Sequence, residues 1–192
     1  MGSTARASRG DTRQRIQHVA LSLFAERGYE KTSLREIAEH LQVTKAALYY
    51  HFKSKEDLII SVFDDGCRPL DELIEWGRQQ PRTLETKQEL VRRYSAALHD
   101  AAPLFRFIQE NQATVRELSI GERFKERMFS MFDLIKEDDW TLTDRVRGVS
   151  ALFTIHAGMF ALRDIEGDPE DKQDAVLEVA LEMVTSAHHP QS

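Results

Sequence analysis

The sequence is poor in cysteine, with Cys67 as the only thiol among 192 residues. One cysteine cannot close an internal disulfide or supply the several thiolates of a structural zinc site, so Cys67 is expected to be a small packing residue. Apolar runs fall short of the roughly 18 to 20 residues that cross a bilayer, and residues 1–17 contain no hydrophobic signal region. We therefore expect a cytoplasmic protein with no membrane partner.

Motifs of common enzyme classes are missing as well. The sequence contains neither a phosphate-binding glycine loop nor a His-Glu-x-x-His metal motif. The pair His188–His189 is expected to lie in an unanchored tail, and the acidic pairs Asp64–Asp65 and Asp138–Asp139 suit turns or exposed helix faces better than an acid/base site. We expect no enzyme activity, no metal and no cofactor.

Apolar residues make up 41% of the sequence. This is enough for a buried core in one compact domain or two small ones. The net charge of −6 is unevenly distributed. Residues 1–60 contain ten Lys/Arg against seven Asp/Glu, a net +3, and the remainder carries −9. Because polyanions bind where positive charge gathers, the N-terminal part is the candidate for contact with nucleic acid.

The N-terminal sixty residues begin with a basic stretch and a helical pattern. Residues 1–10 place Arg6 and Arg9 among small residues and predict a flexible basic arm, either an untethered tail or a DNA contact. A helix is predicted to start at Asp11 and to stop at Gly28. Its buried face is predicted to carry Ile16, Val19, Ala20, Leu23 and Phe24.

Two short helices follow, each with a capping signal. Ser33–Glu36 is a capping box, Gln42–Val43 turns the chain, and Thr44 is placed to cap the next helix. The inward positions of that next helix are predicted to be Ala47, Leu48 and Phe52. A fourth helix begins at Ser54–Asp57. Two short helices joined by a tight turn are typical of helix-turn-helix proteins, whose second helix enters the major groove of DNA.

These residues closely resemble the DNA-binding domain of TetR-family transcriptional regulators. The resemblance covers about residues 12–60 and rests on the segments Leu23–Tyr29, Ser33–Ala38, Val43–Phe52 and Lys55–Leu58. It implies an all-α fold of about nine helices, in which an N-terminal three-helix helix-turn-helix domain is followed by a helical ligand-sensing and dimerisation domain. The predicted division is residues 1–10 as arm, 11–60 as DNA-binding domain and 61–192 as effector-binding and dimerisation domain.

One position departs from the family pattern. TetR-family proteins usually place glycine in the turn between the two short helices, and this chain has Gln42 there. A residue with a Cβ is strained if the turn requires a positive φ angle. The sequence therefore predicts a slightly altered turn before the third helix.

The resemblance divides the predicted DNA-binding residues into two roles. Those that match phosphate-positioning residues are Tyr49, His51 and Lys55, and those that match the groove-facing set are Arg35, Lys45, Ala46 and Tyr50. The capping residues Ser33 and Thr44 complete the set. A Tyr-Tyr pair outside such a motif is more often part of a core, but here Leu48 and Phe52 already take the inward positions.

Beyond Asp64 the sequence contains only successive helical patterns, without strand alternation or repeats. The predicted helices are 55–79 with a bend near Pro69, 84–100, 103–118, 121–137, 142–164 and 170–187. The last two are the expected dimer interface, because apolar groups lie nearly all round 142–164. Interface residues are predicted to be Phe153, Ala157, Phe160, Ala161, Val176, Val179, Ala180 and Met183.

A ligand pocket is predicted in the same C-terminal part, where large apolar residues gather with a few polar ones. The candidates are His99, Phe107, Ile108, Asn111, Met128, Phe132, Phe153 and His156, each of which is also compatible with an ordinary core. The predicted protein is a homodimeric repressor that binds a near-palindromic double-stranded operator and is released by a small apolar or aromatic ligand. The alternative is a DNA-binding regulator whose C-terminal domain binds a protein partner or no effector.

Overall fold

The computed structural model describes residues 3–118 and 120–188, with side chains from residue 12 onward apart from 114, 115 and 159. This part of the chain contains eleven α-helices and no strand. The helices form two compact units, which are described separately. Unit 1 runs up to Gly66 and includes Pro103–Gly121, and unit 2 consists of Cys67–Ala102 and the chain from Glu122 onward.

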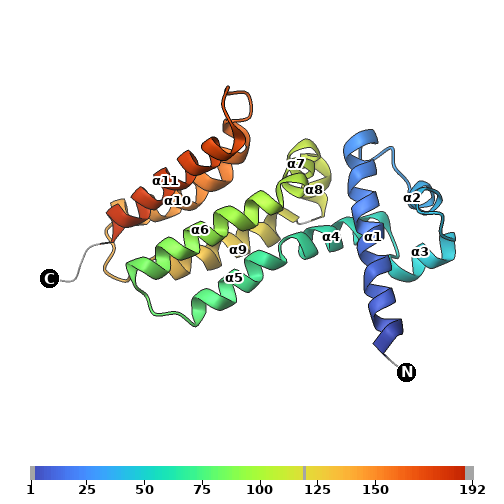
Figure 1. Ribbon diagram of the computed structural model, residues 1–192, viewed down its shortest axis with the longest axis horizontal. Coiled ribbons are helices and arrows are strands. Elements are labelled where there is room, and N and C mark those ends of the chain that lie inside the picture. The colour runs from blue at the N-terminus through green and yellow to red at the C-terminus, as the bar shows by residue number, and fades with distance from the viewer. Residues whose placement is uncertain (1–2, 119, 189–192) are drawn as a thin grey trace. The chain divides into compact units, whose positions relative to one another are not determined.

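Unit 1 contains the three N-terminal helices of the predicted DNA-binding domain and three others (Figure 1). Its helices are α1 (Ser3–Arg27), α2 (Leu34–His40), α3 (Lys45–His51), α4 (Lys55–Gly66), α7 (Ala102–Glu110) and α8 (Gln112–Glu117). Unit 2 contains α5 (Arg68–Arg78), α6 (Leu84–Asp100), α9 (Ile120–Ile135), α10 (Leu142–Ala161) and α11 (Pro169–Ala187). The all-α prediction is confirmed in the described residues.

The first helix begins earlier than predicted. Residues 3–10, expected to be a flexible arm, are the first turns of α1, and the first two residues of that arm lie outside the described part. Helix is compatible with this stretch because it contains two alanines and no proline before α1 ends. The predicted stop is correct: Gly28 adopts φ +87°, a left-handed conformation that glycine adopts without steric cost.

Two predicted helices are each divided in the structure, which is why the described residues form eleven helices rather than about nine. The segment 55–79 breaks at Cys67, and Pro69 stands in the first turn of α5, where its missing N–H costs nothing. The segment 103–118 breaks at Asn111 into α7 and α8. Because α7 and α8 belong to unit 1, the expected boundary at residue 61 does not coincide with the division into compact units.

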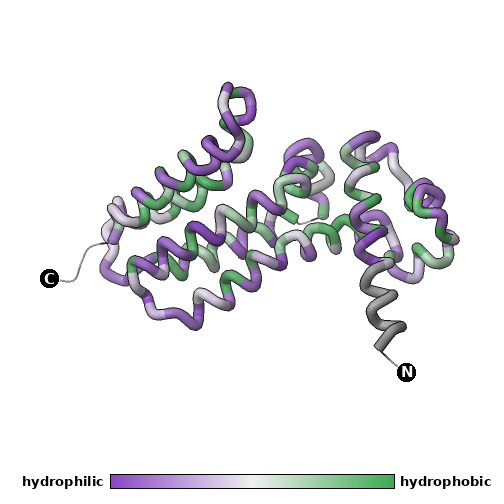
Figure 2. The backbone as a smooth tube through the Cα atoms, in the orientation of Figure 1, coloured by the Kyte–Doolittle hydropathy of each residue, from purple (hydrophilic) through white to green (hydrophobic). Residues whose placement is uncertain are grey.

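The core of unit 1 is built around one face of α1. Of the five residues predicted for this face, four are buried and Val19 is half-buried. The rings of Phe24, Tyr29 and Phe107 form an aromatic cluster, with centroid separations of 5.1 to 6.1 Å. Figure 2 shows apolar and polar residues alternating along the helices, as expected of helices with one buried face. Burial of each such ring contributes about 1.5–3 kcal/mol.

In unit 2, α10 and α11 run side by side (Figure 1). Gly158 permits close contact, since a Cβ there would lie 2.6 Å from the Cγ2 of Val176. A capping box between Thr141 and Asp144 begins α10, and Asp168 caps α11. Both helix starts are therefore determined by local side-chain hydrogen bonds.

An ion cluster connects three segments of unit 2. Lys87 of α6 is fully buried and forms an ion pair with Glu137, which also contacts His188 Nδ1 at 2.9 Å. Burial opposes ionisation of Glu137, but the hydrogen bonds from Lys87 and His188 hold its pKa below the ordinary value. The end of α11 is thus anchored at His188, where the sequence predicted an unanchored tail; His189 lies outside the described residues.

The turn between α2 and α3 contains the predicted departure from the family pattern. Gln42 has φ +56°, and the turn is closed by the hydrogen bond from Val43 N to Ala38 O at 3.0 Å. A left-handed conformation is costly for a residue with a Cβ. The turn thus has the positive φ angle at which a Cβ is strained, and the predicted alteration of the turn stays a prediction.

We predict that Gln42→Gly raises the free energy of unfolding by about 1 kcal/mol, because relief of backbone strain exceeds the larger entropy of unfolded glycine. Gln42→Val is the matched control and should lower it by about 1 kcal/mol, since a β-branched residue tolerates positive φ poorly. Urea denaturation of both variants measures the difference. Equal stability of the two variants would contradict the strain argument.

Candidate nucleic-acid interface

The start of α2 is determined by the predicted capping box. Ser33 Oγ accepts a hydrogen bond from Glu36 N at 3.3 Å, and Ser33 N donates to Glu36 Oε2 at 2.7 Å. The backbone and side-chain hydrogen bonds of Ser33 hold the pKa of Glu36 below its ordinary value. Ser33 therefore orients α2 with both its hydroxyl and its amide.

The helix α3 is held by its inward side chains and its cap. Leu48 and Phe52 are fully buried, and Thr44 Oγ1 accepts a hydrogen bond from Ala47 N at 3.1 Å. The guanidinium of Arg13 from α1 lies 4.5 Å from the centre of the Phe52 ring, a contact the sequence analysis did not anticipate. Ala47 was predicted to face inward but is exposed, because a seven-residue helix buries only a narrow stripe.

The outer side of α3 presents aromatic and basic groups. Tyr50 is 71% exposed and Tyr49 is 42% exposed, an unusual density of exposed rings on so short a helix. Lys45 Nζ lies 5.5 Å from the centre of the Tyr49 ring, and the rings of Tyr50 and His51 are 5.4 Å apart. Ala46 is exposed beside them. This side of α3 is able to donate hydrogen bonds and to stack against a planar or polyanionic partner.

Arg35 on α2 is available for an external contact. Its Nε lies 2.7 Å from Glu39 Oε1, but the two side chains are 76% and 61% exposed. An exposed ion pair within one helix is worth only a few tenths of a kcal/mol, so it is easily exchanged for a contact with a stronger anion.

Lys55 was predicted to contact a DNA phosphate, but in the structure its ammonium group is bound within unit 1. Its Nζ donates a hydrogen bond to the carbonyl oxygen of Tyr29 at 2.9 Å and lies 4.1 Å from the Tyr29 ring centre. Only 19% of the side chain is exposed. Lys55 is thus engaged in holding the start of α4 to the loop after α1, because a long side chain can reach a carbonyl as readily as solvent.

A family model described as bacterial regulatory proteins of the tetR family matches residues 16–62. An HTH-type transcriptional regulator of Staphylococcus aureus (strain USA300) is 31% identical over 142 residues, which span 69% of this chain and 72% of that protein. The chain belongs to the TetR family of transcriptional regulators.

Other relatives agree with this family membership. The HTH-type transcriptional regulator AcrR of Shigella flexneri is 48% identical over 54 residues, which are 28% of this chain and only 25% of AcrR. A solved TetR/AcrR-family regulator of Thermobifida fusca has 27% identity and a TM-score of 0.61, covering 94% of this chain and 100% of its own.

One further solved structure is similar to this chain in fold. FadR of Bacillus subtilis, solved in complex with stearoyl-CoA, has 21% identity and a TM-score of 0.66 over 92% of this chain and 99% of its own.

As a TetR-family member, the chain is a DNA-binding transcriptional regulator. This family is not enzymatic, in agreement with the sequence-based expectation. Among the described residues, no helix is long and apolar enough to cross a membrane.

The residues predicted to line a TetR-family ligand pocket do not form one group. Phe107, Ile108 and Asn111 lie on or directly after α7 in unit 1, and Phe107 is buried against α1. In unit 2, His99 and Phe153 are exposed, whereas Met128, Phe132 and His156 have interior contacts. Tyr94 Oη donates to Met128 Sδ at 2.9 Å, Phe132 packs on Trp140, and His156 lies between the rings of Phe124 and Phe160.

The residues predicted for the TetR-family dimer interface also divide into two groups. Phe153, Ala157, Ala161 and Val179 are exposed. Ala180 is fully buried, Val176 contacts Gly158, and Met183 Sδ lies 3.8 Å from Thr154 Oγ1. This second group, with the half-buried Phe160, serves the packing of α10 and α11 within one chain, because the same small or apolar side chains suit either contact.

We predict that Phe107→Ala lowers the free energy of unfolding by about 3–5 kcal/mol, because it removes a buried ring from the aromatic cluster of unit 1. Phe129→Ala is the matched control, since Phe129 is 59% exposed, and should cost about 0.5 kcal/mol. Denaturant unfolding measures both. Similar small costs would mean that Phe107 is not part of this core.

Proposed function

We propose that this TetR-family regulator is a homodimeric repressor that binds a near-palindromic operator and leaves it when a small apolar or aromatic ligand binds. The observation that carries the proposal is the outer side of α3, where exposed Tyr49, Tyr50 and Lys45 surround a helix held from within by Leu48. A helix with this exposure fits the major groove, where its side chains meet base edges.

The DNA contacts are proposed to divide by chemistry. Lys45 and Arg35 donate to guanine O6 and N7, Ala46 contacts a thymine methyl group, and Tyr50 lies against the groove. Tyr49 and His51 donate to phosphates and set the register of the protein on the duplex. Ser33 and Thr44 position the two helices through their caps. Lys55 acts as a positioning residue through its bond to Tyr29.

Dimerisation is proposed to use the exposed apolar side of α10 and α11. Val146, Phe153, Ala157 and Ala161 follow one another along a single side of α10, and Val146 and Phe153 are each 56% exposed. Val179 on α11 is 41% exposed. Two copies related by a two-fold axis would cover these groups and place two α3 helices roughly 34 to 36 Å apart, one turn of DNA.

The ligand is proposed to enter unit 2 near Met128 and His156. Burial lowers the pKa of His156, so its imidazole is neutral and lies between the rings of Phe124 and Phe160. Such surroundings favour an apolar or aromatic group over an anionic one. The solved FadR structure is a complex with stearoyl-CoA, whose acyl chain is an apolar group of the kind that these surroundings favour, so stearoyl-CoA is the first compound to test. Release requires only that the ligand bind the DNA-incompetent conformation more tightly.

Selection of bound fragments from genomic DNA at a stated salt concentration tests DNA recognition, and we expect the selected fragments to share an inverted repeat.

Lys45→Ala should change the preferred bases within each half-site, because a base contact is lost. Tyr49→Ala should weaken binding to all sequences alike, because a phosphate contact is not sequence-specific. Glu110→Ala, an exposed change on α7, is the control and should alter neither. A motif without two-fold symmetry would contradict the dimer, and a uniform loss with Lys45→Ala would contradict its groove-facing role.

We predict that stearoyl-CoA raises the thermal unfolding midpoint and weakens operator affinity by about tenfold or more, a typical allosteric coupling. Coenzyme A without the acyl chain is the control and should do neither. Stabilisation without any change in operator affinity would contradict ligand release. Equal behaviour of the two compounds would contradict a fatty acyl ligand.

A further inference from the structure

Gln17 is a polar residue on the buried face of α1. It lies three residues before Ala20 and seven before Phe24, so it belongs to the stripe of α1 that packs inside unit 1. Among the side chains of α1 that the structure describes, Gln17 is the one polar group that is buried, with 7% of its surface exposed. Burial of a carboxamide is costly unless its hydrogen bonds are satisfied. No role for this residue was predicted from the sequence.

The carboxamide of Gln17 uses both of its N–H groups on α4. Its Nε2 donates to Ser61 Oγ at 3.1 Å and to Asp65 Oδ2 at 2.5 Å. Ser61 Oγ is able to accept, because its own hydrogen is donated to Leu58 O at 2.8 Å. The reverse orientation would place the carboxamide oxygen against a carboxylate, so the donor side faces α4. Because Ser61 and Asp65 are one turn apart, the two bonds hold α1 in a single register along α4.

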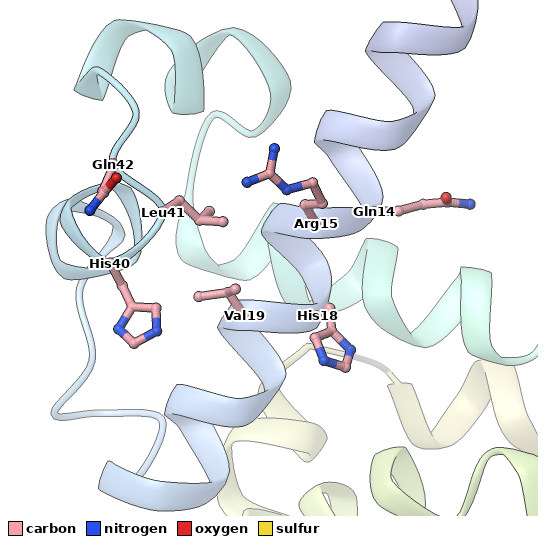
Figure 3. Close-up of a pocket in the computed structure, with 7 residues that line it drawn as sticks. All are labelled: Gln14, Arg15, His18, Val19, His40, Leu41 and Gln42. Carbon is pink, nitrogen blue, oxygen red and sulfur yellow. The ribbon is translucent and has the colours of Figure 1, made fainter.

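The same helix α1 supports the two helices proposed to contact DNA. Arg13, one turn before Gln17, has its guanidinium 4.5 Å from the centre of the Phe52 ring. Phe52 is the residue that ends α3, and it is fully buried. Further along α1, Figure 3 shows Val19 and Leu41, the residue that ends α2, directed toward each other. The register of α1 therefore determines where it meets both helices.

We propose that Gln17 is a positioning residue for the contacts of α3 with DNA. Its bonds to Ser61 and Asp65 fix α1 on α4. The register of α1 then reaches α3 through the contact of Arg13 with Phe52. An apolar side chain at residue 17 would be buried as well, but it would not select one register, because apolar contacts are not directional. This inference rests on the proposed function, in which α3 enters the major groove of the operator.

Exchange of donor and acceptor across the link tests this role in the full-length protein, with the inverted-repeat fragment selected from genomic DNA as the probe. Gln17→Glu places a second carboxylate beside Asp65. We expect operator affinity to fall by about tenfold or more, the usual consequence of losing a charged hydrogen bond. The double variant Gln17→Glu with Asp65→Asn should recover most of this loss, because the new carboxamide can donate to the new carboxylate.

Gln14→Glu is the matched control for charge. It makes the same chemical change on α1, at an exposed residue whose side chain is directed away from the turn between α2 and α3 (Figure 3). Any loss of affinity that it causes measures the general repulsion of one added negative charge from DNA. We expect this loss to be several-fold smaller than that of Gln17→Glu. Equal losses would overturn the proposal, because charge alone would account for both.

A purely structural role for Gln17 is distinguished by measuring affinity under conditions in which urea denaturation shows each variant to be folded. Such a role predicts that Gln17→Glu lowers the free energy of unfolding while the folded protein binds the operator with native affinity, and this result would refute positioning. If Gln17→Glu does not fold, Asp65→Asn alone weakens the same bond. It should lower operator affinity several-fold, although loss of a negative charge by itself favours DNA, and native affinity would count against the proposal.

The position of α3 is also followed without DNA, by NMR of the ring protons of Tyr50 and His51. Their resonances should shift in Gln17→Glu and return toward the native values in the double variant. If the native protein binds no operator but these shifts occur, the proposed function fails and the positioning of α3 by Gln17 stands. Resonances that stay unchanged in Gln17→Glu would show that Gln17 does not position α3.

Discussion

The position of α3 depends on the burial of two side chains. A helix of seven residues is not stable alone in water, because nucleation is costly and few hydrogen bonds follow it. Leu48 and Phe52 are fully buried, and Thr44 satisfies the amide of Ala47. These contacts hold one side of α3 within unit 1 and leave Lys45, Tyr49 and Tyr50 on the other side. The proposed contacts of α3 with DNA depend on this attachment.

The elements predicted correctly are those whose signals are local. Ser33 and Thr44 determine where α2 and α3 begin through hydrogen bonds to residues three positions later, and Gly28 ends α1 through its own φ angle. Such signals act within one turn of helix and do not depend on the partner that the helix packs against. The strain at Gln42 was predictable for the same reason, since it depends on one residue and one turn.

The residue roles that the sequence left ambiguous depend on partners distant in the chain. A buried face is evident from the spacing of Phe107 on its helix, but the spacing does not distinguish a core formed with α1 from a ligand pocket. Ala180 is small enough for either a dimer contact or the packing of α11 on α10, and it serves the packing. Lys55 has the reach for a phosphate or for the carbonyl of Tyr29. The spacing of apolar residues along a helix shows which face is buried, but it does not show which element that face packs against.

The turn between α2 and α3 contains a strained backbone position at Gln42. The hydrogen bonds from Gln42 N to Glu39 O at 3.1 Å and from Val43 N to Ala38 O at 3.0 Å require a left-handed residue between the two helices. Glycine would satisfy these bonds with less strain. Because this turn directly precedes α3, the backbone geometry of Gln42 helps to set the position of the same helix that Leu48 and Phe52 hold from within.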